Sequence, residues 1–401
     1  MAREYPIVTV NEKAEKRVRA GHPWVYGDDL IGISGELADG GLADVRSEKG
    51  KLLGTAFYNS ASKIRLRVVS TNANDKFDEK FWRRRIAYAL DYRKTVMGTD
   101  FDCSRLIFGE ADGLPGMTAD LFGTVLVTEI ACKGIDMLKE MLYRLLREEL
   151  AVRGVTLSAI YERNELALRD KEGLERYKGF AYGEGDGIVY ITENGIKYKV
   201  DYINGQKTGF FLDQKYNRQA VARIAKGKRV LDCFTHTGAF ALNAAAAGAE
   251  LVTAVDVSGE AIEKVKENAA LNGLTERMQF LKADVFDLFT NWEETGDKYD
   301  LIILDPPAFT KSSSTVGKAI GGYREINRRA MKLLPRGGYL ATCSCSHFMT
   351  DELFCKMLRS AAEEACVSLK QIERRTQSPD HPIMWNVPET DYLKFYIFQI
   401  I

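Results

Sequence analysis

The stretch Leu301-Ile302-Ile303-Leu304-Asp305-Pro306-Pro307-Ala308-Phe309 has the pattern of a buried strand that stops at its carboxyl end. An apolar run suits a strand that is covered on both faces, and proline does not continue a central strand. In open α/β sheets, ligands bind outside the carboxyl ends of the strands. The sequence therefore predicts that Asp305 lies at a ligand site.

A second run, Thr342-Cys343-Ser344-Cys345-Ser346, stands at the end of the next expected strand. It brings thiols to the same edge of the sheet as the carboxylate of Asp305. Because a thiolate is a strong nucleophile, this pair suggests covalent chemistry on an electrophilic ring.

From Val221 onward, strand-like and helix-like segments alternate, which predicts an α/β fold with a doubly wound parallel sheet. Strands are expected at 229–233, 251–256, 278–281, 299–304 and 339–343. Helices are expected at 239–247, 259–272, 323–334 and 351–365.

The chain before this sheet has two further parts. Up to Ser70, short β-rich segments are separated by Gly, Asp and Asn, as in a small β-barrel. Beyond it, helices are expected at 77–95 and 134–152 among strands, and Glu193-Asn194-Gly195 predicts a hairpin turn. We therefore expect domains at 1–72, 73–200 and 201–401.

Composition restricts the class of protein. The 401 residues carry 56 Lys+Arg and 56 Asp+Glu, so a nucleic-acid partner would need local basic patches. No apolar run is long enough for a membrane span, and the first residues lack a signal peptide's apolar stretch. The seven cysteines form no C-x-x-C pair. We expect free thiols in the cytoplasm, no membrane partner and no metal site.

The residues from Val230 to Phe240 predict a strand, a turn and the start of a helix, which is the first crossover of a nucleotide-binding sheet. The turn contains one glycine, Gly238, and no G-x-G-x-x-G motif. A nicotinamide-dependent oxidoreductase is therefore disfavoured, because no cradle for a pyrophosphate is evident. The turn suits a ligand with an adenosine and no phosphate, although a purely structural turn stays open.

Acidic residues stand at successive strand ends. Asp256 ends the second strand, where a carboxylate can accept hydrogen bonds from both ribose hydroxyls. Asp284 follows the third strand, where it can accept from an adenine amino group. Either residue alone is more often a helix N-cap. Together with Asp232 in the first strand, they favour a nucleoside-containing cofactor.

These residues resemble the class I S-adenosylmethionine (SAM)-dependent methyltransferases over roughly Val200 to Ile401. Longer motifs are similar to the RlmI-like ribosomal RNA cytosine-5 methyltransferases. They are N-G-Q-K-T-G-F-F-L-D-Q at 204–214, Arg105 with G-E-A-D-G-L-P-G at 109–116, and G-H-P-W-V-Y at 21–26. The resemblance implies a Rossmann-like class I methyltransferase sheet, preceded by a β-barrel PUA domain that binds RNA and a central α+β domain.

The resemblance also implies that SAM is the cofactor. Four residues before the sheet would help enclose its methionine part: Phe210, Phe211, Asp213 and Gln214. From the residues alone, packing of the two phenylalanines is the favoured interpretation. The other expected cofactor contacts are Asp232, Phe234, Thr235, Gly238, Asp256, Val257, Asp284, Val285 and Asp305.

The expected chemistry is methylation of C5 of a cytosine in large-subunit (23S) rRNA. Cytosine C5 is a poor nucleophile until a thiolate adds at C6, and a carboxyl group near N3 stabilises the charge that builds there. The resemblance favours Cys345 as the nucleophile and Asp305 as the acid, with Cys343 as a small core residue. Ala308 stands where many RNA cytosine-5 methyltransferases have a second cysteine that assists release.

Two rival functions remain at this point. Amino-group methyltransferases of the adenine N6 type have an aromatic residue directly after Asp-Pro-Pro, whereas here Phe309 comes one position later. A non-catalytic RNA-binding protein of the same fold would not need the acids and the thiol.

The target base must lie in a loop or be flipped out, because its carbon is inaccessible in a stacked helix. Expected RNA contacts are Lys16, Arg17, Arg19, Trp24, Arg65 and Arg67. Arg83–Arg85 form a further basic cluster, and Glu110, Asp112, His236 and His381 are weaker candidates for the cleft. Each basic cluster alone is more often a solvated surface, and Trp24 is equally suited to a core. The sequence leaves a homodimer open.

Overall fold

The structure, a computed structural model, describes residues 5–295, 298–310 and 312–401. The chain folds into two compact units. The first comprises the chain up to Tyr190, Val200–Leu212 and Pro379–Val387, and the second comprises Ile191–Lys199, Asp213–Ser378 and Pro388–Ile401. The segment Pro379–Val387, expected in the third domain, thus belongs to the first unit.

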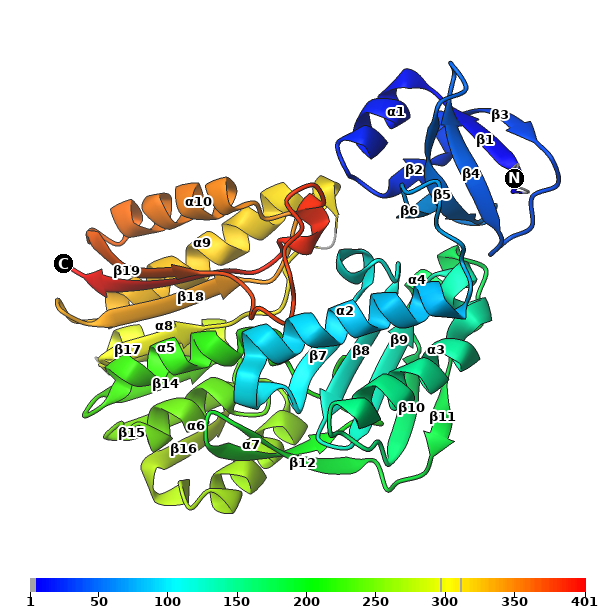
Figure 1. The fold of residues 1–401 in the computed structure, drawn as a ribbon. Helices are drawn as coiled ribbons and strands as arrows, with labels where there is room; N and C mark the ends of the chain where they lie inside the picture. Colours follow the sequence, from blue (N-terminus) through cyan, green and yellow to red (C-terminus); the bar gives the residue numbers. More distant parts are fainter. Residues whose placement is uncertain (1–4, 296–297, 311) are drawn as a thin grey trace. The chain divides into compact units, whose positions relative to one another are not determined.

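The N-terminal part of the first unit is a six-stranded sheet in the order β2-β6-β5-β4-β1-β3 (Figure 1). β1 and β4 pair in parallel, and the other neighbours pair antiparallel. Val8, Val10 and Val45 lie in a hydrophobic core of its own. The strands are β1 (Ile7–Val10), β2 (Trp24–Tyr26), β3 (Leu30–Ser34), β4 (Leu42–Ser47), β5 (Leu52–Tyr58) and β6 (Ile64–Ser70).

Helix α1 (Glu12–Arg19) differs from the expectation, which has only strands in this region. The side chain of Asn11 caps it by accepting a hydrogen bond from the backbone N–H of Ala14 at 2.9 Å. Its buried face consists of Ala14 and Val18. Two apolar residues in two turns are too few for helical periodicity to be recognised in the sequence.

The rest of the first unit has a five-stranded sheet in the order β11-β10-β9-β8-β7. The strands are β7 (Cys103–Phe108), β8 (Met117–Phe122), β9 (Val125–Ile130), β10 (Ala159–Asn164) and β11 (Tyr177–Gly183). The helices are α2 (Glu79–Met97), α3 (Lys133–Val152) and the short α4 (Leu168–Lys171). The apolar faces of α2 and α3 share one core with these strands, which confirms the two helices expected here.

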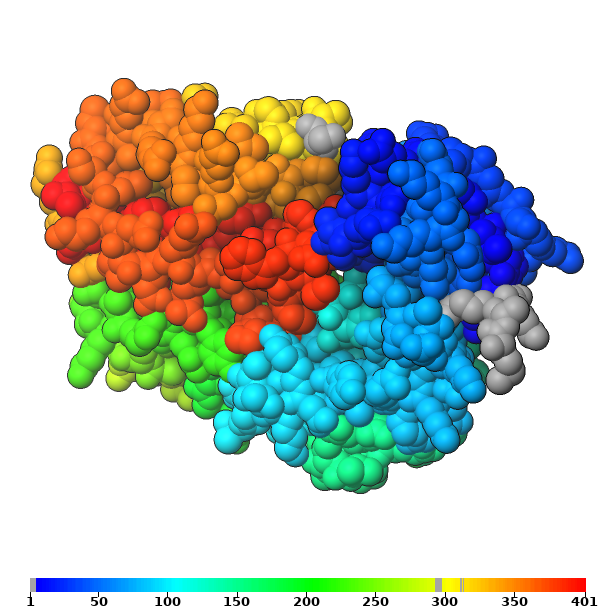
Figure 2. Space-filling view, turned by 45° about the horizontal axis from the view of Figure 1, so that its top comes forward, coloured from blue at the N-terminus to red at the C-terminus, as the bar shows by residue number. Residues whose placement is uncertain are grey.

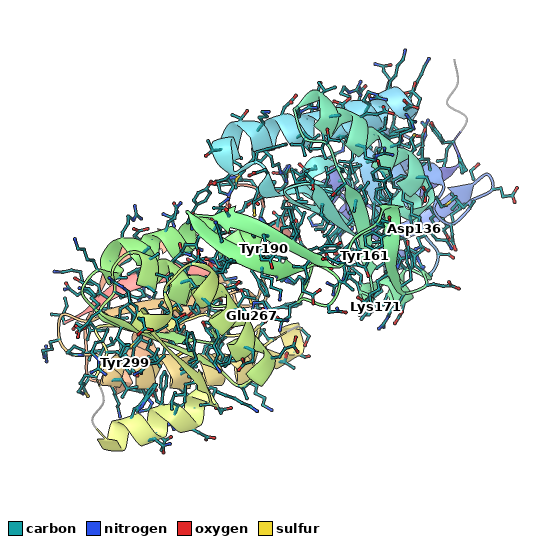
Figure 3. The ribbon with its side chains drawn as sticks, turned by 90° about the horizontal axis from the view of Figure 1, so that it is seen from below. Asp136, Tyr161, Lys171, Tyr190, Glu267 and Tyr299 are labelled. Atoms are coloured by element: carbon teal, nitrogen blue, oxygen red, sulfur yellow. The ribbon has the colours of Figure 1, made fainter. Side chains whose placement is uncertain are left out.

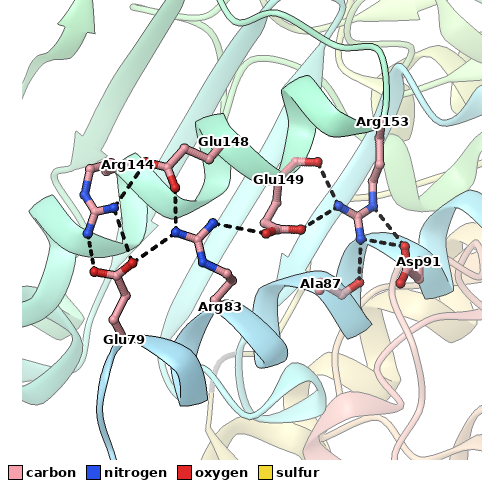
Figure 4. A network of polar contacts seen from close by, with 8 residues as sticks. All are labelled: Glu79, Arg83, Ala87, Asp91, Arg144, Glu148, Glu149 and Arg153. Atoms are coloured by element: carbon pink, nitrogen blue, oxygen red, sulfur yellow. Dashed lines mark hydrogen bonds and ion pairs between the residues drawn. The ribbon is translucent and has the colours of Figure 1, made fainter.

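The outer faces of α2 and α3 are joined by ion pairs (Figure 4). Arg83 on α2 contacts Glu79 at 3.0 Å and, on α3, Glu148 at 2.6 Å and Glu149 at 3.2 Å. The pKa of Arg83 is accordingly raised by these hydrogen-bonded carboxylates. Arg83, part of a basic cluster in the sequence, is therefore neutralised by the acids of the neighbouring helix.

The second unit contains a seven-stranded sheet in the order β16-β15-β14-β17-β18-β20-β19 (Figure 1). The strands are β14 (Arg229–Cys233), β15 (Leu251–Asp256), β16 (Met278–Lys282), β17 (Leu301–Leu304), β18 (Tyr339–Ser344), β19 (Leu369–Arg375) and β20 (Lys394–Ile400). β14 to β18 pair in parallel, as expected. β20 runs antiparallel between β18 and β19, which the sequence-based expectation does not include.

Strand order reverses between β14 and β17, so the ligand-binding crevice of such a sheet opens beside these two strands. The helices of the unit are α5 (Lys215–Ala225), α6 (Ala239–Ala246), α7 (Gly259–Leu271), α8 (Val285–Thr295), α9 (Val316–Leu333) and α10 (Asp351–Glu364). α6, α7 and α10 match the expected ranges within one residue at each end. α9 begins earlier than expected, and α5 and α8 were not expected.

The hairpin of β12 (Ile188–Glu193) and β13 (Ile196–Asp201) has the expected turn, since Asn194 and Gly195 have φ angles of 55° and 79°. Side chains of α7 hold β13: the backbone N–H of Lys199 donates to Asn268 Oδ1 at 2.9 Å, and its Nζ contacts Glu267 at 3.0 Å. Glu267 is labelled in Figure 3. Strand β13 is thereby fixed to α7.

Short 3-10 helices complete the structure: η1 (Gly27–Asp29), η2 (Gly98–Asp100), η3 (Gly109–Asp112), η4 (Leu212–Gln214), η5 (Thr275–Arg277), η6 (Ser313–Thr315) and η7 (Pro388–Thr390). Among the described residues, no helix is both long and apolar enough to cross a membrane.

Candidate active site

The carboxyl ends of β14 to β18 bring most of the predicted site residues of the second unit to one edge. Leu304 pairs with Cys233 on one side and with Thr342 on the other. Asp305 therefore lies between the end of β14 and the Thr342–Ser346 run. This is the arrangement that the apolar strand and its Asp-Pro-Pro end predict.

The turn after β14 has an unusual backbone. Phe234, His236 and Gly238 have φ angles of 62°, 53° and 82°, and positive φ is uncommon for residues other than glycine. The buried carboxylate of Asp232 holds the turn, since its Oδ2 accepts from Thr235 Oγ1 at 2.6 Å and from the backbone N–H of Ala241 at 3.0 Å. These hydrogen bonds hold the turn in an uncommon backbone conformation, as is often found at functional sites.

The other oxygen of Asp232, Oδ1, is buried without a hydrogen-bond partner in the described part of the chain. Burial raises the pKa of this carboxyl to about 7, and the nearby charges of Asp305 and Asp256 act in the same direction. A perturbed carboxyl at the edge of a sheet is typical of a ligand site. In this structure the Asp232 carboxyl group affects the ligand site through the conformation of the turn after β14, which it holds by hydrogen bonds.

The carboxylates of the next two strand ends also hold backbone. Asp256 accepts from the N–H of His236 at 3.0 Å and of Ser258 at 2.9 Å, and Asp284 accepts from the N–H of Phe286 at 2.8 Å. A carboxylate offers about four acceptor sites, so both groups keep capacity for a ligand. Of their neighbours, Val257 is exposed and Val285 is buried.

Asp305 is contacted by two side chains of the second unit. Gln214 donates from Nε2 to its Oδ1 at 3.2 Å, and the thiol of Cys343 donates to the same oxygen at 3.0 Å. Burial and the Asp305 carboxylate raise the pKa of Cys343 well above its ordinary value, so this thiol is protonated. Cys343 is buried, as expected for a core residue, but it also orients Asp305.

Cys345 is half-buried, and the two serines beside it point into the protein. Ser344 Oγ donates to Tyr323 Oη at 3.0 Å, and Ser346 Oγ donates to the carbonyl oxygen of Thr310 at 2.9 Å. Cys345 itself directly follows the end of β18. The two thiols differ in partner and exposure: Cys343 is buried and contacts Asp305, whereas Cys345 is half-buried and is the more accessible of the two.

The remaining residues expected around the methionine part divide between the units. Phe210 is buried and Phe211 stacks under Lys207, whose Nζ lies 4.3 Å from the ring centre, both in the first unit. Asp213 is buried in the second unit and accepts from Tyr392 Oη at 2.7 Å. Packing explains Phe210 without a ligand.

Among the predicted RNA contacts, Arg67 is 5% exposed, and its guanidinium bridges Glu110 at 2.8 Å and Glu172 at 2.9 Å. Trp24 Nε1 donates to the same Glu110 at 2.8 Å. Both terminal nitrogens of Arg67 are thus used in a buried network, which argues against the predicted contact of this residue with RNA. Glu110, a weak candidate for the cleft, belongs to the same network.

The other basic residues are more accessible. Lys16 pairs with Glu12 at 2.7 Å and Arg19 with Glu15 at 2.5 Å on the surface of α1. Arg17 pairs with Asp29 in a mostly buried position. Arg65 donates a long hydrogen bond to the carbonyl oxygen of Asn59, at 3.4 Å.

The charged motif residues of the first unit pair with other residues of that unit. Arg105 binds both oxygens of Asp120, at 2.7 and 2.8 Å, and Asp112 pairs with the buried Arg93. His381 is 2% exposed and contacts Asp380 at 2.9 Å. These partners argue against a contact of Asp112 or His381 with a substrate.

A pocket of about 690 Å³ lies within the first unit. Its lining includes His22, Tyr88, Tyr92 and Met384, and Trp385 beside it is 96% exposed. Tyr92 Oη donates to the carbonyl oxygen of Pro379 at 3.0 Å, so the segment 379–387 borders α2 (Figure 2). Trp385 is not among the residues expected from the sequence, because exposure of a single aromatic residue leaves no pattern in a sequence.

The edge of the second unit fits the cofactor that the resemblance implies. A one-glycine turn leaves room for an adenosine, Asp256 can accept from two ribose hydroxyls, and Asp284 can accept from an amino group. The unpartnered Oδ1 of Asp232 lies under the same turn. In the described residues, no group of histidine, cysteine and acidic side chains could hold a metal ion.

Comparison with known proteins agrees with this geometry. The chain matches the model of the S-adenosylmethionine-dependent methyltransferases over residues 106–398 and that of a PUA-like domain over residues 8–71. A candidate SAM-dependent methyltransferase from Streptococcus mutans shares the fold, with a TM-score of 0.82 at 23% identity over 98% of this chain and 99% of that chain. The expected methyltransferase sheet, PUA-like domain and SAM cofactor are confirmed.

Two curated relatives cover nearly the whole chain. Ribosomal RNA large subunit methyltransferase I of Klebsiella pneumoniae (strain 342) is 37% identical over 400 residues, with 99% of both chains covered. The protein of the same name from Erwinia tasmaniensis is 39% identical over 390 residues, with 96% of this chain and 97% of the relative covered. This chain therefore belongs to the SAM-dependent methyltransferases, in the family that includes ribosomal RNA large subunit methyltransferase I.

Proposed function

We propose that the protein methylates C5 of a cytosine in large-subunit (23S) rRNA through a covalent bond between Cys345 and C6 of the base. The relatives named above support ribosomal RNA as the substrate. The observation that carries the chemistry is the pairing of β17 with β18, which brings Asp305 and the run containing Cys345 to one edge of the sheet. C5 chemistry needs an acid and an accessible thiol at the same edge of the sheet.

In this mechanism the Cys345 thiolate forms a bond to C6, and the electron pair of the C5–C6 bond becomes available at C5. Asp305, held by Gln214 and Cys343, faces N3 and stabilises the charge of the adduct by a proton or a hydrogen bond. Bound SAM supplies an electrophilic methyl group. Loss of the C5 proton then expels the thiolate and restores the aromatic ring.

The position of Phe309 argues against amino-group methylation. Its ring packs on Tyr323 of α9 at 4.6 Å between centres, and a side-chain carbon on Gly322 would lie 3.3 Å from it. A ring held against α9 in this way is engaged in the core rather than presented to a base. This supports C5 chemistry over the adenine N6 type.

The RNA would bind partly to the first unit. We propose that the exposed Lys16 and Arg19 of α1 contact phosphates and that Trp385 stacks on an unpaired base. Val18, Gly21 and Met384 line the pocket, so these groups border one surface of the first unit. Arg67 is not part of this proposal.

The test is a methyl-transfer assay with labelled SAM and 23S rRNA from a strain that lacks the enzyme, followed by nucleoside analysis. We expect 5-methylcytidine as the product and loss of activity in Cys345→Ala, with unchanged SAM binding. RNA that contains 5-fluorocytidine should form a stable adduct with Cys345, because fluorine cannot leave as a proton.

Other outcomes would select a different function. N6-methyladenosine as the product, with Cys345→Ala fully active, would establish the amino-group alternative. Absence of SAM binding in calorimetry would contradict catalysis and favour a binding protein on the same fold.

A further inference from the structure

Lys394, at the start of β20, is a buried cation bonded to the residue after the proposed nucleophile. The residue is 4% exposed and pairs with Ser344 across β18 and β20. Its Nζ donates to the carbonyl oxygen of Ser346 at 2.7 Å and to that of Tyr392 at 3.0 Å. Lys394 thus binds the backbone carbonyl of the residue that follows Cys345.

The ammonium group of Lys394 lacks a bonded counter-charge. Both of its hydrogen-bond acceptors are neutral carbonyls, and within the described residues it forms no ion pair. A buried charge that is held only by neutral groups is costly, and an anion nearby reduces that cost. Burial lowers the pKa of Lys394 to about 8, whereas the charges of Asp391, Cys345 and Asp351 act in the opposite direction.

Of these three groups, Cys345 is the one placed to react. Asp351 already accepts from Tyr396 Oη at 2.5 Å and contacts Arg374 at 2.7 Å. The loop that contains Cys345 is fixed at Ser346 by two bonds, one from Lys394 and one to Thr310. The thiol and the ammonium are therefore held by the same short segment.

We propose that Lys394 is a positioning residue that stabilises the thiolate of Cys345 and fixes the strand end that presents it. The inference rests on the proposed function for the catalytic use of this thiolate. What it predicts directly is the reactivity of the Cys345 thiol. The thiol proton goes to solvent, Lys394 keeps its own proton, and the thiolate electron pair forms the S–C6 bond. When that bond breaks, the pair returns to sulfur beside the same cation.

Several titratable groups besides Lys394 and Cys345 belong to this cluster. Cys343, in β18, interacts with Cys345, and the carboxylates of Asp351 at the start of α10 and Asp391 just before β20 act on Lys394. His347, two residues beyond Cys345, has a pKa lowered by burial and, to a smaller extent, by Lys394. Changing Lys394 alone keeps these other groups in place.

The experiment measures alkylation of the full-length protein by iodoacetamide without RNA, with each cysteine followed by peptide mass spectrometry. Lys394→Met removes the charge at similar length, and Lys394→Arg keeps it. We expect the rate at Cys345 to fall about tenfold at pH 7.5 in Lys394→Met and to stay within about threefold of wild type in Lys394→Arg. The exposed Cys366 serves as the internal control and should not change.

Wild-type protein supplies a test that needs no variant. Its Cys345 should reach half of its maximal alkylation rate about one pH unit below Cys366. An equal or higher midpoint, or an unchanged Cys345 rate in a folded Lys394→Met protein, would overturn the proposal.

The outcome is separable from that of the proposed function. If Cys345 reactivity depends on Lys394 but no 5-methylcytidine is formed, the charge pairing stands and the C5 reaction fails. If 5-methylcytidine forms and the alkylation rate of Cys345 does not depend on Lys394, the C5 reaction stands and the charge pairing fails. For the methylation assay we expect Lys394→Met to lower kcat about tenfold or more with little change in KM, and Lys394→Arg to restore most of it.

Discussion

The thiol of Cys343 donates a hydrogen bond to Oδ1 of Asp305 at 3.0 Å. The first cysteine of the Thr-Cys-Ser-Cys-Ser run therefore orients the catalytic acid instead of reacting with the substrate nucleobase. Gln214 reaches the same oxygen at 3.2 Å. The two donors leave the carboxyl group in one orientation at the end of β17.

Replacing Cys343 should therefore slow methyl transfer without abolishing it. Cys343→Ala removes one weak donor to a charged acceptor, and we expect kcat to fall about threefold to tenfold, with unchanged SAM affinity. Cys343→Ser keeps a donor and should retain most of the activity. Steady-state kinetics of both variants beside Cys345→Ala check this, and equal inactivity of all three would contradict separate roles for the two thiols.

Position 238 requires glycine for two reasons: its backbone has a positive φ angle, and a side chain would have no room. Its φ angle is 82°, and a Cβ there would lie 2.7 Å from Val265 Cγ1 of α7. We expect Gly238→Ala to destabilise the second unit by about 2–4 kcal/mol and to weaken SAM binding. Gly273→Ala is a matched control, because Gly273 also has a positive φ, 66°, but open space around it, and should cost only about 1 kcal/mol. Denaturant unfolding and calorimetry measure both; equal losses would show that the contact with Val265 does not matter.

Asp232 should give the second unit a distinct pH dependence. Its pKa is raised from 3.8 to about 7, so the folded state binds the proton more tightly than the unfolded state. The stabilisation is complete below the unfolded value and is lost as the pH rises toward and through 7. The free energy of unfolding of wild type relative to Asp232→Asn should therefore fall by on the order of 1–3 kcal/mol between pH 4.5 and 7.5 and level off above. A difference that stays constant over this range would show that the carboxyl titrates normally.

Substitution of Arg67 should affect stability, whereas substitution of the surface cations of α1 should affect RNA binding. Arg67→Met leaves Glu110 and Glu172 buried without their cation, so we expect a loss of about 3 kcal/mol or more in the stability of the first unit. Lys16→Gln with Arg19→Gln should leave stability nearly unchanged and reduce the salt dependence of RNA binding by up to two ion equivalents. Filter binding at several salt concentrations separates the two effects, and an unchanged slope in the double variant would exclude α1 from the RNA surface.

Trp385 should matter for RNA and not for folding. It is 96% exposed, so Trp385→Ala removes almost no packing. We expect its loss to weaken binding of single-stranded RNA about fivefold or more, because stacking on an aromatic ring contributes about 1–3 kcal/mol per base. Tyr190, 63% exposed and labelled in Figure 3, is the aromatic control. Equal effects of Tyr190→Ala and Trp385→Ala on RNA affinity would argue against a specific stacking site.

The sequence by itself determined the sheet of the second unit. Apolar runs, strand ends marked by acids or prolines, and helical periodicity depend on neighbours in the chain, so β14 to β18 and the helices α6, α7 and α10 could be placed within a few residues. The Asn194-Gly195 hairpin is equally local. These are the parts for which local preference and the global fold agree.

Only the tertiary structure decided what each polar residue does. Arg67 and Lys16 look alike in a sequence, but one lies in a buried network and the other on the surface of a short helix. Cys343 and Cys345 are two residues apart, yet one orients Asp305 and the other is accessible. Lys394 is nearly fifty residues from Cys345 in the chain, and antiparallel pairing of β20 with β18 brings it to the same strand end. Burial, partners and charge arise from contacts between distant segments, and no local pattern of the sequence contains them.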